Sequence, residues 1–73
     1  MATKLTCKTL QKARDDEPIF VLVAHDRVAP ATVREWARRA LALGSPEEKC
    51  REAMDCALDM ELWQRNNGAK TPD

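Results

Sequence analysis

Two consecutive helices joined by a very short turn are the feature that most restricts how this chain can fold. Pro30 suits the first turn of a helix, where a missing N–H group costs nothing, and Gly44 suits the left-handed residue that ends one. Ser45 and Glu48 then match a capping box that opens a second helix, and Gly68 suits its end. The turn is too short for any arrangement but an antiparallel one. The sequence therefore predicts a helical hairpin.

The predicted helices cover residues 30–43 and 46–66, and they differ in how much of their surface is apolar. The first has an ordinary apolar stripe that includes Trp36, which we expect to pack in the core. In the second, apolar side chains cover more than half of the circumference, which is typical of a helix with more than one neighbour. Glu61 lies near the centre of that stripe, so we expect it to reach solvent or to meet an arginine.

A β-strand is predicted at residues 18–25, a run rich in β-branched and aromatic side chains. Both faces of this strand are apolar, and its edges need hydrogen-bond partners. Residues 4–10 could supply the second strand of a hairpin, although residues 11–13 could equally extend a short helix. The same strand of a second copy is the other candidate. The predicted fold class is α+β: a short strand or hairpin followed by an antiparallel helical hairpin.

The length of 73 residues predicts a single small domain over residues 1–73, with a marginal core of its own. Residues 1–14 are expected to form a strand or to be flexible, and residues 68–73 a flexible tail. One copy would leave the strand and a flank of the second helix exposed. We therefore expect a homodimer formed through those two apolar surfaces.

Composition argues against several kinds of partner. Twelve Lys and Arg residues balance twelve Asp and Glu residues, whereas proteins that bind polyanions usually carry a basic surplus. No run approaches the roughly 18 apolar residues of a membrane span, and no apolar secretory leader begins the sequence. We expect a cytoplasmic protein with no membrane partner. The three cysteines contain no CxxC pair, and we expect them to be reduced.

No group of residues has the spacing of a catalytic or metal site. His25 and Asp26 are neighbours whose side chains diverge at the end of a strand, so they do not form an acid–base pair. We expect Asp26 to close a turn with its own backbone, and His25 to lie at the strand end or at an interface. His25 has no nearby cysteine or second histidine with which to hold zinc. The sequence predicts a protein that is not an enzyme and has no metal or cofactor.

Three sets of side chains are candidates for contact with other macromolecules. The protein-binding or dimer surface is predicted at Val21, Val23, Leu62 and Trp63. An acidic strip, Glu52, Asp55 and Asp59, could imitate phosphates toward a protein that binds nucleic acid. A basic face on the first helix, Arg34, Arg38 and Arg39, carries the alternative function, a small DNA-binding transcriptional regulator.

Scattered positions over residues 17–73 resemble a family of small uncharacterised proteins of phage and prophage genomes. The similar positions are Glu17-Pro18-Ile19-Phe20-Val21-Leu22, Ala24, Asp26, Ala29-Pro30, Val33, Trp36-Ala37, Ala53, Met60-Glu61, Trp63-Gln64 and Pro72-Asp73. The chain departs from the family pattern at Val23, where a basic residue is expected, and at His25, where an amide is expected. The resemblance implies a viral accessory protein. The leading hypothesis is a non-enzymatic protein-binding module that inhibits a host or defence protein, such as one of a CRISPR-type system.

Overall fold

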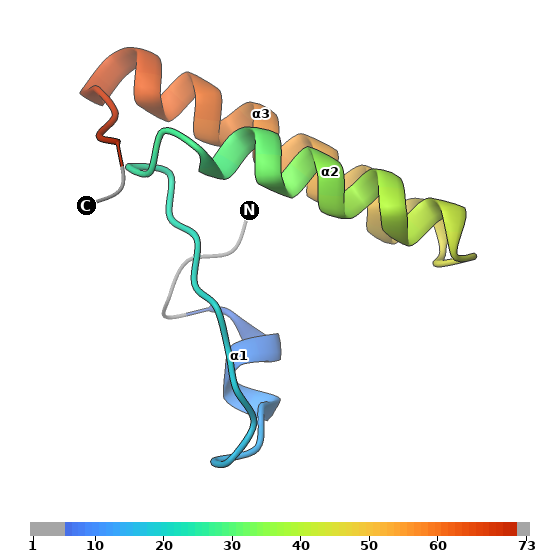
Figure 1. Cartoon of the computed structure of the whole chain (residues 1–73). Helices are drawn as coiled ribbons and strands as arrows, with labels where there is room; N and C mark the ends of the chain where they lie inside the picture. Colours follow the sequence, from blue (N-terminus) through green and yellow to red (C-terminus); the bar gives the residue numbers. More distant parts are fainter. Residues whose placement is uncertain (1–5, 72–73) are drawn as a thin grey trace.

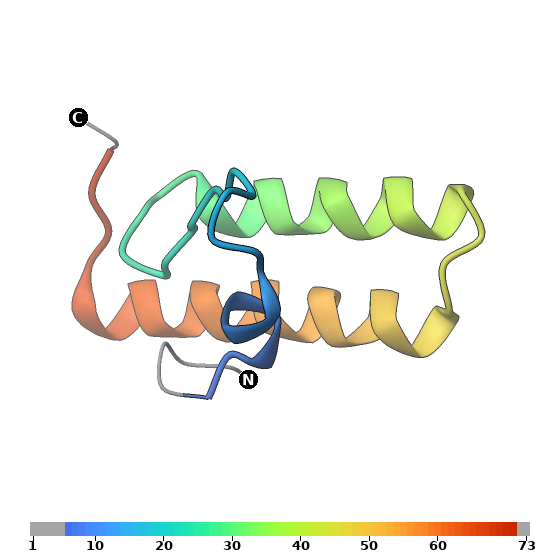
Figure 2. The same cartoon turned by 90° about the horizontal axis from the view of Figure 1, so that it is seen from below.

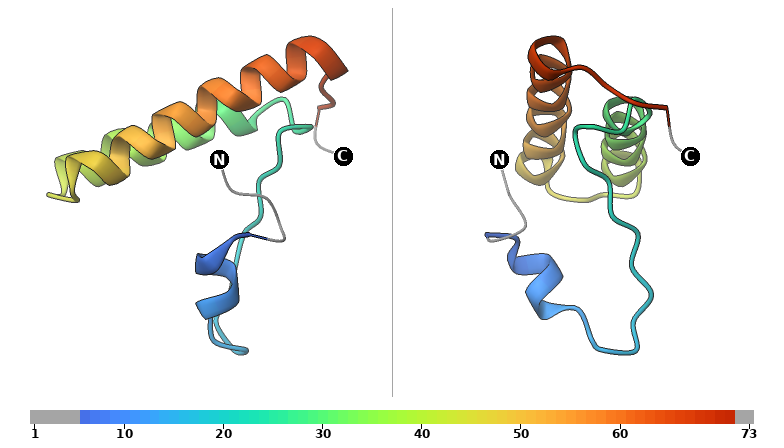
Figure 3. Two further views of the ribbon diagram at one scale, coloured as in Figure 1. Left: turned by 180° about the vertical axis from the view of Figure 1, so that it is seen from behind. Right: turned by 90° about the vertical axis from the view of Figure 1, so that its left-hand side faces the viewer.

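The computed structural model describes residues 6–71, which form a helical hairpin with an arm projecting from one end (Figures 1 and 2). The helices are α1 (Lys8–Lys12), α2 (Ala29–Ala42) and α3 (Glu47–Asn67). Helices α2 and α3 pack side by side and antiparallel. We call residues 7–24 the arm: α1 turns back into an extended segment that leads to α2, and the arm stands away from the helix pair (Figure 3).

Local signals at the helix ends act largely as the sequence indicates. The helices expected at residues 30–43 and 46–66 lie at Ala29–Ala42 and Glu47–Asn67, and Pro30 occupies the first turn of α2. Gly44 follows α2 with φ +92°, a conformation that strains any side chain. The predicted capping box is wrong: α3 is preceded by Pro46, and no side chain bonds its first N–H groups.

The core between α2 and α3 is made of small residues. Ala29, Ala37 and Ala57 are almost fully buried, and their size lets the two backbones approach closely. Pro30, Cys50 and Met60 are also buried. The core position predicted for the tryptophan of α2 is wrong. Trp36 is 51% exposed, because it lies about 100° around the helix from Ala37.

The predicted α+β fold is also wrong, because the described residues contain helices and no strand. Residues 18–23, predicted to be a strand, are irregular. The only β contact within residues 6–71 is one isolated parallel bridge between Asp26 and Lys70. A β-strand needs a second extended segment beside it, with hydrogen bonds between the two backbones over several residues. In the candidate neighbour within the chain, residues 4–10, residues 8–10 belong to helix α1 instead, and residues 4 and 5 lie outside the described part.

The two chain ends are described in part. Of residues 1–14, predicted as strand or flexible, residues 8–12 are helix α1, and residues 1–5 lie outside the described part. Of the predicted flexible tail, residues 72 and 73 also lie outside it. Lys70 is attached to the rest of the fold: its N–H donates to the carbonyl of His25 at 2.8 Å. The described part of the tail therefore crosses beside the start of α2 (Figure 3).

Candidate interaction surfaces

The arm presents a row of apolar side chains to solvent. Ile19, Phe20, Val21 and Val23 are all more than half exposed, and Phe20 reaches 86%. Between the arm and α3 lies a groove of about 880 Å³. Its lining includes Leu10, residues 19–24, Cys56 and Met60. So much exposed apolar surface on so few residues is unusual for a monomer and is typical of an interaction site.

A network of hydrogen bonds fixes the base of the arm to α3. The side-chain amide of Gln64 donates to the carbonyls of Ala24 and Asp26, both at 2.9 Å. The carboxylate of Asp26 accepts from the N–H of Val28 at 2.8 Å, which confirms the predicted Asx turn. The N–H of Arg27 donates to the carbonyl of Lys70 at 2.9 Å. This base sets the direction in which the arm leaves the hairpin.

The four residues predicted as one protein-binding surface belong to two surfaces. Val21 and Val23 lie on the arm, and Trp63 lies at its base, where its ring centroid is 6.1 Å from that of His25. Leu62 is about 100° from Trp63 around α3 and faces another direction. The structure therefore separates Leu62 from Trp63, its neighbour in the sequence, and places Trp63 beside His25.

Leu62 belongs instead to an exposed ridge on α3. We call Met54, Leu58 and Leu62 the α3 ridge: they recur every fourth residue and are 44%, 52% and 45% exposed. The sequence shows that α3 has a wide apolar surface, and only the contact line with α2 identifies Met54 and Leu58 as its exposed part. The spacing of four residues is the signal that could have grouped them.

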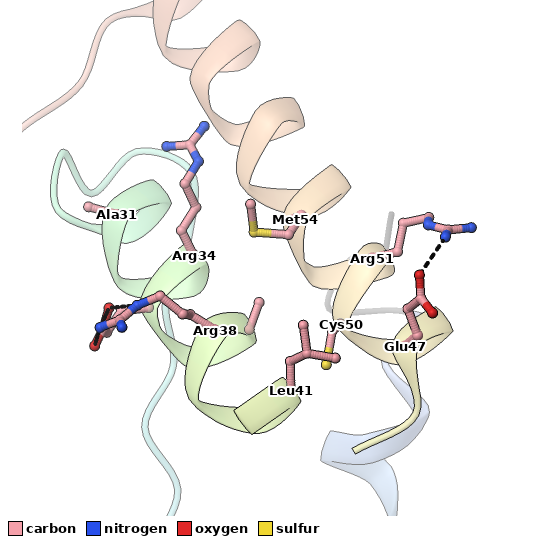
Figure 4. Close-up of a pocket in the computed structure, with 10 residues that line it drawn as sticks. Ala31, Arg34, Arg38, Leu41, Glu47, Cys50, Arg51 and Met54 are labelled. Atoms are coloured by element: carbon pink, nitrogen blue, oxygen red, sulfur yellow. Dashed lines mark hydrogen bonds and ion pairs between the residues drawn. The ribbon is translucent and has the colours of Figure 1, made fainter. Parts of the chain in front are cut away.

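A second groove, of about 690 Å³, lies between α2 and α3 beside this ridge (Figure 4). Leu41, Cys50 and Met54 point into it from the two helices. Charged pairs border it, among them Arg51 with Glu47 at 3.2 Å. The ion pair between Arg34 and Glu61 joins α2 to α3, which confirms the arginine partner expected for Glu61.

The acidic strip predicted on the second helix lies on the side of α3 that faces away from α2. Glu48, which sequence analysis left out, extends it, because residues 48, 52, 55 and 59 recur at intervals of four, three and four. We call these four residues the acidic stripe; it runs along about 16 Å of the helix. None of the four carboxylates has an ion pair with another described residue. The α3 ridge and the acidic stripe are neighbours on the helix surface.

The arginines predicted as a basic face are bonded to carboxylates of their own chain. Arg34 pairs with Glu61, while Arg38 and Arg39 both bind Glu35, with Nε–oxygen distances of 3.0 and 2.9 Å. Hydrogen bonds from Arg38, which has the larger effect, and from Arg39 lower the pKa of Glu35 from 4.5 to about 2. The same contact raises the pKa of Arg38. The basic face is therefore largely neutralised.

The residues considered for acid–base chemistry and metal binding are separate from one another in the described part of the chain. His25 contacts the ring of Trp63, and the carboxylate of Asp26 is engaged with the backbone of Val28, so the two do not act together. Within residues 6–71, no three histidine, cysteine or acidic side chains come close enough to hold a metal ion. The described helices also include none with the length and hydropathy needed to span a bilayer.

Comparisons with protein-family models, with curated proteins and with solved structures found no significant match to this chain.

Proposed function

We propose that this chain is a non-enzymatic protein-binding module that contacts a foreign protein through the outer side of α3. The observation that carries the proposal is the pairing of the α3 ridge with the acidic stripe. The ridge offers three apolar side chains close to half exposed, and the stripe offers four carboxylates without a counter-charge among the described residues. Protein interfaces combine an apolar centre with a charged rim in this way.

The charge of the stripe defines the chemistry of the partner. Carboxylates that have no ion pair with another described residue favour a partner that has basic residues beside an apolar strip. Proteins that bind nucleic acid carry such basic surfaces. Together with the resemblance to small phage proteins, this supports an inhibitor that occupies the nucleic-acid-binding surface of a host or defence protein, such as a CRISPR-type effector.

The alternative, a DNA-binding regulator, has less support. Its three arginines are each engaged by a carboxylate, which lowers the net positive charge that they offer to phosphates. The exposed side of α3 is acidic and would repel DNA. A gel-shift titration at low and high salt separates the two functions: the regulator would retard duplex DNA in a salt-dependent way, and we expect no retardation.

Affinity capture from the lysate of a bacterial host tests the main proposal. Leu58→Asp inserts a charge into the ridge, and the double variant Glu52→Gln/Asp59→Asn removes two charges from the stripe. We expect both to lose the captured protein. Raising the salt concentration should also weaken wild-type capture, since the Debye length falls from about 10 Å at 0.1 M to about 3 Å at 1 M.

The matched control is Asp15→Asn/Asp16→Asn, which changes the net charge equally but at the tip of the arm. It should capture the partner as the wild type does. The proposal fails if no protein is enriched over beads without bait. It also fails if the stripe variant and the arm-tip control behave alike.

A further inference from the structure

The accessible area of this chain is too large for a compact molecule of its mass. Its area is 6287 Å², whereas a folded monomer of 8.2 kDa is expected to expose about 4,500 Å². The excess is about 1,800 Å². A standard interface removes about 800 Å² from each partner, and obligate dimers remove more. An excess of this size exceeds the area that each partner buries in a standard interface.

Within five consecutive residues of the arm, Ile19, Phe20, Val21 and Val23 are all more than half exposed, and the same segment carries a row of unused backbone groups. Residues 19–23 run extended, and their N–H groups donate to no other described residue. The carbonyls of residues 18–22 likewise accept nothing within the described part of the chain. Exposed apolar side chains on an unpaired extended backbone are the features of a sheet edge that awaits a partner strand.

We propose that the occupant of this edge is the arm of a second copy of the chain. The two arms pair antiparallel over residues 19–23, with the two-fold axis at Val21. An isologous contact of this kind places one surface against itself, so one patch on each copy is enough. The arm reaches away from the helix pair (Figure 1), and Ile19, Phe20, Val21 and Val23 are accessible to such a partner, because each is more than half exposed.

Charge and side-chain pairing favour this register. With Val21 opposite itself, Ile19 faces Val23 and Phe20 faces Leu22, so each apolar side chain has an apolar neighbour across the ribbon. Glu17 then faces His25. A shift of the axis by one residue, to Leu22, would place Pro18 opposite Asp26 and lose this match.

This inference concerns the arm, and the proposed function concerns α3, so each can fail separately. Val21→Asp places two carboxylates opposite each other at the two-fold axis, and Val21→Lys does the same with two ammonium groups. We expect each variant to be monomeric. Val21 is 63% exposed in the single chain, so neither change disturbs the helix pair; far-UV circular dichroism checks that the helices remain.

The decisive experiment mixes the two variants. Light scattering and native mass spectrometry should find twice the chain mass for the wild type, the chain mass for each variant, and twice the chain mass again for the mixture, as an Asp–Lys heterodimer. Leu58→Asp is the control, and it should remain dimeric. Conversely, Val21→Asp should still capture the partner of the α3 ridge.

Three results would overturn the inference. The wild type could remain a monomer at the highest soluble concentration. Val21→Asp could remain a dimer, which would move the interface away from the arm. The mixture could fail to form the heterodimer, which would exclude a two-fold axis at this residue.

Discussion

Replacing Gln64 by alanine is expected to release the arm from the hairpin. The Gln64 amide is the side chain that joins α3 to the backbone on both sides of His25, by donating to Ala24 and Asp26. Alanine preserves the helix, since it has the highest helix propensity. It removes both hydrogen bonds and leaves two partly buried carbonyls with fewer donors.

The size of the effect follows from those two bonds. Each contributes about 0.5–1.5 kcal/mol net, so the loss should be about 1–3 kcal/mol. A chain of 73 residues is expected to have a free energy of unfolding of about 4–11 kcal/mol. The loss is therefore a large fraction of the total. With a slope near 1 kcal/mol per molar urea, it would lower the unfolding midpoint by about 1–3 M.

Urea denaturation followed by helical circular dichroism measures this change, at one fixed protein concentration because a dimer's stability depends on concentration. A matched change, Gln11→Ala, removes the amide of an exposed side chain in α1 and should leave the midpoint in place. The reasoning is refuted if Gln64→Ala and Gln11→Ala shift the midpoint equally.

Gln64→Glu separates the hydrogen bonds from the loss of side-chain volume. The carboxylate has nearly the same shape but meets two carbonyl oxygens, so at pH 7 this variant should be less stable than Gln64→Ala. The same repulsion raises the carboxyl pKa in the folded state. Stability should therefore recover as the pH falls toward about 4, where the protonated acid can donate one bond. An unchanged difference from the alanine variant across that range would contradict the assignment.

Two further changes test the helix pair. The pKa of Glu35 is lowered from 4.5 to about 2. The stability that this carboxylate contributes is therefore complete above pH 4.5 and is lost as the pH falls toward 2. An NMR titration of the Glu35 carboxyl with a midpoint at pH 4 or above would contradict its double contact with Arg38 and Arg39. Gly68 has φ +85° and ψ +166°, a region almost confined to glycine, so Gly68→Ala should lower the free energy of unfolding by about 1–3 kcal/mol. Thermal unfolding measures that loss, and a difference near zero would mean that the chain leaves α3 in another conformation.

Features that depend on neighbours in the sequence could be predicted. The pairing of Glu61 with an arginine followed from its place on an amphipathic helix, and the turn at Asp26 from the bonding habit of its side chain. The predicted protein-binding surface stays a prediction. Val21 and Val23 lie on the arm and Trp63 lies beside His25, whereas the ridge to which Leu62 belongs could be recognised only once the contact line between the helices was known.

The sequence by itself determined the helical hairpin, because proline, glycine and the periodicity of apolar residues act within a few residues of where they stand. The state of residues 18–25 was decided by tertiary structure. A strand exists only when a second segment supplies hydrogen bonds along its edge. Within a single copy, residues 8–10 of the candidate segment are helical, as part of α1. Tertiary packing also decided which side of α3 is covered, because alanines at the contact bring the helices close together and leave the larger side chains of the ridge outside.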